Sequence, residues 1–198
     1  MFDSGKAVRE LIDELKDEVD IAIEIPDTTY LVWLNTVEQL CYSEIIKEQR
    51  ETTKLYPTTP VEMSSLEISE DEAPIRFEDI LTIYADNIEL IKSTVASGNI
   101  FTDTYYKVNN SIAFNVEYEV RELNVIYHAR PKPKTTAEGN IMLPLEFVEL
   151  VKTKMRGEAY KLANEDALSS KWLNDYNVLL ETFKAWCESK SSQFGLRG

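Results

Sequence analysis

Apolar residues recur at helical spacing in two successive runs near the C-terminal end of the chain. Pro144 suits the first turn of the first helix, and Asn164, Glu165 or Asp166 can cap the second. The stripes are Phe147, Leu150, Val151, Met155, Ala159 and Leu162, and then Leu168, Trp172, Tyr176, Leu179, Phe183 and Trp186. Both stripes need cover from water, so the pattern predicts a helical hairpin over 143–189, with a close helix contact at Gly157.

Two further helices are expected at the N-terminal end, over residues 3–49. The first covers 3–22 and is apolar on one face and mostly acidic on the other. Pro26 interrupts the pattern, and the second helix, from about residue 28 to 49, is apolar around much of its circumference. Such width indicates burial on several sides, either in the core or against another subunit.

The stretch over 51–79 has a different character. Three prolines and several serines argue for a long connection, although 52–56 resemble a short strand. Between Pro57 and Asp79, Arg76 is the single basic residue against seven acidic ones. Long connections inside compact domains are uncommon and often functional. We therefore interpret 51–79 as a long acidic arm or flap.

Between residues 80 and 130 the spacing changes to that of β-strands. Two turn-prone pairs, Asp86-Asn87 and Asn109-Asn110, each separate two runs of β-branched and aromatic residues, which indicates two hairpins. A further alternating run ends at Pro131. The predicted fold is α+β, in a single domain over 1–198. Helical hairpins from the N- and C-terminal parts would pack together, with a small central antiparallel β-sheet.

Composition and charge argue against several classes of function. Apolar residues make up 43% of the 198, enough for a core, and 21 Lys and Arg face 35 Asp and Glu, a formal charge of −14. Such a surface repels phosphate backbones, which argues against a general nucleic-acid binder. Cys41 and Cys187 lie on apolar helical faces, so we expect buried thiols in a reducing compartment rather than a disulfide. No membrane-spanning run and no basic leader are present, so we expect a soluble protein made in a cytosol.

The residue types of common catalytic and metal sites do not occur in useful groups. The one histidine, His128, falls in a strand pattern without a cysteine or serine motif, which favours a structural role. One histidine and two distant cysteines do not make a zinc site, and the acids over 67–72 lack the glycine of a calcium loop. No glycine-rich phosphate loop is present. We expect no enzyme activity, no catalytic residue, no metal and no cofactor.

Two short basic stretches differ from the acidic average. One is the proline-containing segment over 130–134, and the other is the tail over 190–198, which has no acids. The candidate partner-binding residues are Arg130, Lys132, Lys134, Lys190, Phe194 and Arg197. They would dock onto an acidic or grooved partner. A solvated turn and a frayed terminus are the alternative interpretation.

The order of elements resembles the head–tail adaptor (connector) proteins of tailed bacteriophages, from about residue 25 to 188. The similarity is one of layout and apolar spacing. It is carried by YLVWLN at 30–35 running to EII at 44–46, LTIYADN at 81–87, YYKVNN at 105–110 with the strand that follows, VIYHARP at 125–131, and LPLEF at 143–147.

The resemblance implies a virion structural protein, made in the bacterial host cytoplasm and located at the virion neck. It implies a homo-oligomeric ring, commonly of about twelve subunits, bound to the portal protein and to the tail or further adaptor proteins. Genomic DNA would pass through during packaging and ejection without specific binding, and an acidic lumen suits such passage. A stand-alone acidic bacterial binding or regulatory protein, not an enzyme, is the alternative. A small hydrolase with an unrecognised site is a more distant one.

Overall fold

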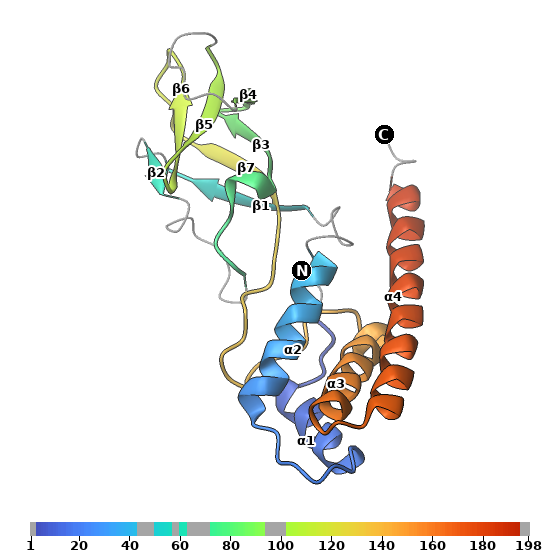
Figure 1. Cartoon of the computed structure of the whole chain (residues 1–198). Coiled ribbons are helices and arrows are strands. Elements are labelled where there is room, and N and C mark those ends of the chain that lie inside the picture. Colours follow the sequence, from blue (N-terminus) through green and yellow to red (C-terminus); the bar gives the residue numbers. More distant parts are fainter. Residues whose placement is uncertain (1–2, 43–49, 57–59, 63–71, 94–101, 195–198) are drawn as a thin grey trace. The chain divides into compact units, whose positions relative to one another are not determined.

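The structure, a computed structural model, describes residues 3–42, 50–56, 60–62, 72–93 and 102–194 (Figure 1). A single domain over 1–198 is expected from the sequence, and within it the chain divides into two compact units. The helical unit comprises Met1–Ile46 and Pro133–Gly198, and the sheet unit comprises Lys47–Lys132. Each unit has a hydrophobic core of its own.

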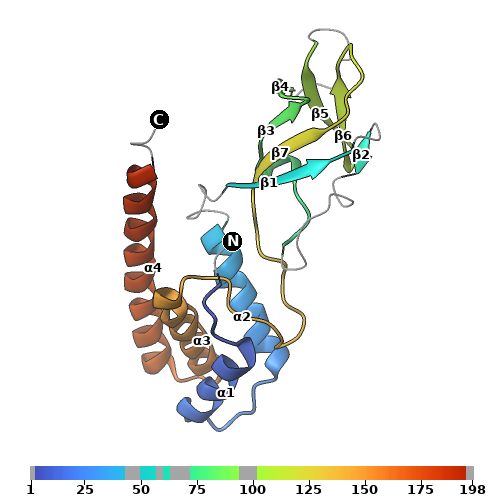
Figure 2. The same cartoon turned by 180° about the vertical axis from the view of Figure 1, so that it is seen from behind.

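The helical unit is built around α3 (Val148–Leu162). α4 (Asp166–Phe194) packs along α3 and continues past its end (Figures 1 and 2). α2 (Asp27–Leu40) and α1 (Val8–Glu18) also contact α3, and the 3-10 helix η4 (Leu145–Phe147) leads directly into it. The chain ends therefore meet in one helical core, in which α3 is the common partner.

The predicted apolar stripes account for most of this core. Phe183 is fully buried, and its ring centroid lies 4.7 Å from that of Phe147, which in turn lies 5.3 Å from that of Trp186. Leu162 and Leu168 are exposed beside the α3–α4 turn, so the two apolar stripes are not buried at that end. Trp172 lies outside the core and is half-buried, with the Arg156 guanidinium over its ring.

Gly157 marks the close approach of α3 to α4, as the sequence analysis proposed. A Cβ atom at this position would lie 2.7 Å from Leu173 Cδ2, 2.8 Å from its Cγ and 3.3 Å from its backbone nitrogen. We therefore expect Gly157→Ala to lower the free energy of unfolding by about 1–3 kcal/mol, because the overpacking outweighs the better helix propensity of alanine. Chemical denaturation followed by tryptophan fluorescence measures this loss.

Leu173→Ala provides the matched control for Gly157→Ala, since it removes the Cγ and Cδ2 atoms that the new Cβ would meet. The double variant should be more stable than the sum of the two single losses predicts. Strict additivity would show that the two helices do not approach closely at this point.

The sheet unit is a seven-stranded sheet in the order β1-β7-β3-β4-β5-β6-β2, curled strongly in both views (Figures 1 and 2). β4 and β5 run parallel, and the other neighbouring strands run antiparallel. The elements are β1 (Arg50–Leu55), β2 (Val61–Glu62), the 3-10 helix η3 (Phe77–Asp79), β3 (Ile80–Ala85), β4 (Ile88–Ser93), β5 (Thr104–Val108), β6 (Ser111–Asn115) and β7 (Leu123–His128).

The predicted fold class is wrong. The sheet is neither small nor purely antiparallel, and it is a separate compact unit rather than a central sheet covered by helical hairpins. The physical reason is curvature, because a curled sheet can enclose apolar side chains on its own concave side. Ile83, Leu90, Tyr105 and Val125 are all buried together in this way. On the N-terminal side, α1 and α2 pack mainly on α3 instead of forming a hairpin of their own.

The predicted acidic arm over 51–79 is also partly wrong. β1 pairs with β7 along its whole length, and Val61 pairs with Ile112 of β6. Ile75 and Phe77 are buried in the core of the sheet unit. Residues 57–59 and 63–71 lie outside the described part of the chain. The described parts of 51–79 therefore belong to the sheet, because their apolar residues fill its concave side.

Candidate functional site

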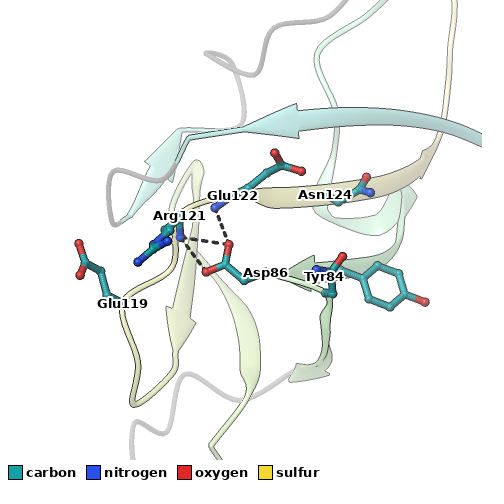
Figure 3. A pocket seen from close by; sticks show the side chains of 7 residues that line it. Tyr84, Asp86, Glu119, Arg121, Glu122 and Asn124 are labelled. Carbon is teal, nitrogen blue, oxygen red and sulfur yellow. Dashed lines mark hydrogen bonds between the residues drawn. The ribbon is translucent and has the colours of Figure 1, made fainter.

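The sheet unit contains a polar pocket of about 570 Å³ where the β3–β4 turn meets the start of β7 (Figure 3). Three carboxylates and one guanidinium line it, a formal charge of −2. The lining residues are Tyr84 of β3, Asp86 and Asn87 of the turn, Glu119, Arg121 and Glu122 before β7, and Asn124 of β7.

Asp86 holds this end of the sheet together. Its carboxylate accepts the backbone N–H of Glu122 at 2.8 Å and that of Arg121 at 3.0 and 3.2 Å, as the dashed lines in Figure 3 mark. Asp86 and Asn87 have φ angles of 45° and 73°, as a tight hairpin turn requires. The sequence predicted the turn, but it carried no signal that the aspartate would bind a loop 35 residues away.

The hydrogen bonds that Asp86 accepts also decide its ionisation. The N–H groups of Arg121 and then Glu122 lower the pKa of the Asp86 carboxyl, so it is ionised at neutral pH. An ionised carboxylate has no proton to donate, and the backbone hydrogen bonds already made by its oxygens weaken Asp86 as a base. The Asn124 Oδ1 atom is buried and has no hydrogen-bond partner among the described residues. The pocket can therefore receive a polar or cationic group.

The two cysteines are free thiols in the helical unit. Burial raises the pKa of Cys41 to about 12 and that of Cys187 to about 11, so both stay protonated and unreactive at neutral pH. Within the described ranges, no three or more His, Cys, Asp and Glu side chains gather as ligands of a metal ion. The described thiols therefore offer no basis for nucleophilic catalysis.

The structure does not bring the predicted docking residues into one surface. Arg130 belongs to the sheet unit, where its Nε donates to Asp79 Oδ1 at 3.0 Å and a second guanidinium nitrogen bonds the same oxygen. Lys134 belongs to the helical unit, where its Nζ lies 2.6 Å from Glu38 Oε2. Both side chains are mostly buried. Each base therefore serves its own unit, which the local sequence did not reveal because the acidic partners lie far along the chain.

The other docking candidates differ from this pair. Lys132 is exposed and forms no salt bridge with any described residue. α4 reaches Phe194, so Lys190 and Phe194 fall in its last turns, but their side chains are not among those described. Arg197 lies outside the described residues. Lys132 and the tail thus remain the candidate docking elements.

The acids of α1 and the segment after it fall into two groups. Lys152 Nζ lies 3.3 Å from a Glu14 oxygen and 2.5 Å from a Glu18 oxygen, which ties α1 to α3. By contrast, a second set is exposed and forms no hydrogen bond or salt bridge with any described residue. This set is Asp13, Asp17, Asp20 and Glu24. Some acids of this region are thus neutralised by α3, whereas Asp13, Asp17, Asp20 and Glu24 are exposed without a salt bridge to the described residues.

A comparison with protein-family models found no match, and no curated protein matched the chain. None of the helices in the described ranges combines the length and apolar character needed to cross a membrane. Any proposal about function therefore depends on the residues and the geometry above.

Proposed function

We propose that this protein is a head–tail adaptor of a tailed bacteriophage. Copies of the chain would form a ring between the portal protein and the tail, through which the genome passes. The motifs over 30–46, 81–87, 105–110, 125–131 and 143–147 support the proposal, because their order resembles that family. The structural observation that carries it is the set of exposed carboxylates without salt bridges in α1 and the segment after it.

Exposed carboxylates without salt bridges suit a channel for DNA. Asp13, Asp17, Asp20 and Glu24 are exposed and lack salt bridges within the described chain. Repeated around a ring, such a surface would repel the phosphate backbone and let the duplex slide without stalling. The acids that face α3 are neutralised by Lys152 and Arg156, so they add little to this field.

The C-terminal end of α4 is the proposed attachment to the portal. The tail over 190–198 has two bases, no acids and one aromatic residue, which is a docking composition in a chain of charge −14. Complementary charge and an aromatic anchor both favour association between preformed partners. Lys132 is a second exposed base that can contribute.

The test is the assembly mass of the purified protein, alone and mixed with its cognate portal. Wild-type protein should form a ring on the portal and should not bind duplex DNA tightly at physiological salt. A chain that ignores the portal would instead fit a stand-alone acidic binding protein. Tight binding of duplex DNA would contradict the proposed acidic channel.

Removing residues 190–198 should weaken binding to the portal by at least about tenfold, the equivalent of 1.4 kcal/mol. The unfolding transition should stay nearly unchanged, because the deletion removes only the end of α4. The matched control is Asp17→Asn, which changes an exposed acid of α1 and should leave portal binding intact. Normal portal binding by the truncated chain would show that the tail is not the docking element.

A further inference from the structure

The connection that returns from the sheet unit to the helical unit is attached to α2 by two side chains. Asn35 Nδ2 donates to the Lys134 carbonyl at 2.8 Å, and the Lys134 N–H donates to Asn35 Oδ1 at 2.8 Å. The Glu38 carboxylate, about one helical turn further on, accepts Lys134 Nζ at 2.6 Å and the Met142 N–H at 2.7 Å. Two polar residues of α2 thus bind both ends of the segment 134–142.

These contacts lie where water is excluded. Glu38 is 1% exposed, and the Lys134 side chain is 12% exposed. Burying a charged pair costs several kcal/mol in desolvation, which the attraction repays only in part, so such pairs are weak sources of net stability. A buried pair does favour the one arrangement of the chain in which both charges meet. Any arrangement that leaves one of the charges buried without its partner is far less favourable.

The two halves of the segment are held by different forces. Ile141 and Leu143 are fully buried in the helical core. Between Lys134 and Asn140, Ala137 is the one buried residue, and Thr135, Thr136, Glu138 and Gly139 are exposed. Backbone segments with few apolar contacts open locally at lower free energy than the core. The end of this half is also attached to the N-terminal segment, because the Gly139 carbonyl accepts the Val8 N–H at 3.0 Å and Asn140 Nδ2 donates to Asp3 at 3.2 Å. The stretch from Lys134 to Glu138 therefore depends on Asn35, Glu38 and Lys134.

We propose that Glu38 and Lys134 form a pH-dependent latch, which holds the return connection on α2 and opens before the helical core unfolds. Opening would free the stretch from Lys134 to Glu138, while Gly139, Ile141 and Leu143 stay in place. This latch is independent of the proposed function, because it rests on contacts within the helical unit.

The pH dependence follows from the burial of Glu38. Desolvation raises the pKa of this carboxyl, and the Lys134 charge and the hydrogen bonds from Lys134 and Met142 offset the rise only in part. In the open latch, Glu38 meets water and returns to its ordinary value of 4.5. The closed state is therefore most favoured below that value and loses stability as the pH rises through the raised pKa. Among the described residues, Cys41 also interacts electrostatically with Glu38, and it stays neutral because burial raises its pKa to about 12.

Hydrogen exchange of the full-length protein, corrected for intrinsic rates, tests the latch between pH 5 and pH 8. The amides of Lys134 and Met142, whose hydrogens Asn35 and Glu38 accept, report opening, and peptides of α3 report the core. These two amides should exchange at least about tenfold faster than α3, and the difference should widen as the pH rises. Exchange of both regions at one rate at every pH would refute a separate opening.

Two substitutions test whether Glu38 and Lys134 control the opening. Glu38→Gln keeps one acceptor, for the Met142 N–H, but turns an NH2 group toward Lys134 Nζ and cannot ionise, so the pH dependence should disappear. Lys134→Met leaves the Glu38 charge without a partner, so opening should increase about tenfold or more at pH 8 and little at pH 5. Lys132→Met, an exposed base two residues earlier, is the matched control and should match the wild type. A Glu38→Gln variant that retains the wild-type pH dependence would overturn the assignment of the latch to Glu38.

Discussion

Phe183→Ala should lower the free energy of unfolding of the helical unit by about 3–5 kcal/mol, the usual cost of deleting a fully buried phenylalanine. Phe183 is 0% exposed and packs against the rings of Phe147 and Trp186. It therefore joins α4 to the start of α3. The cavity would lie between η4 and α4, beside the rings of Phe147 and Trp186.

The three tryptophans make this loss measurable, since Trp33, Trp172 and Trp186 all belong to the helical unit. Denaturant unfolding followed by tryptophan fluorescence reports that unit directly. Val178→Ala is the matched control on the same helix, because Val178 is 67% exposed and its replacement should change stability by about 0.5 kcal/mol or less. A similar loss for the two variants would mean that the buried face of α4 is assigned wrongly.

Arg130→Ala should destabilise the sheet unit by about 3–5 kcal/mol, because it leaves a buried carboxylate without its partner. The Asp79 side chain is 7% exposed and receives two guanidinium nitrogens from Arg130. The backbone makes a further contact between the same two segments, because the Ala73 N–H donates to the Arg130 carbonyl at 2.8 Å. The ion pair thus holds the segment before β3 against the end of β7.

Hydrogen exchange in peptides of β3 and β7 measures this effect without interference from the helical unit. Lys132→Ala removes an exposed base two residues away and should change stability by about 0.5 kcal/mol or less. The comparison also tests the docking hypothesis for the basic segment. Weaker portal binding by Arg130→Ala with unchanged exchange would show that Arg130 meets a partner rather than Asp79.

The sequence predicted much of the local structure, because local signals lie within a few residues of one another. The predicted hairpin turns at Asp86-Asn87 and Asn109-Asn110 both occur, with positive φ at the residues that tolerate it. The stripes of the C-terminal helices identified Phe147, Met155 and Phe183 as buried. The adaptor function, its ring and its partners stay predictions that the experiments above can test.

What the sequence by itself determined is therefore which residues form helices, strands and turns, and which faces are apolar. Only the tertiary structure decided what covers those faces and which charges are paired. Curvature of the sheet closed its core on itself, whereas the apolar pattern was equally compatible with cover by helices. Asp79 and Arg130 are 51 residues apart, and Asn35 and Lys134 are 99 apart. Such pairs depend on the long-range path of the backbone, which periodicity does not encode. For that reason two of the bases predicted to dock on a partner are internal ties of their own units.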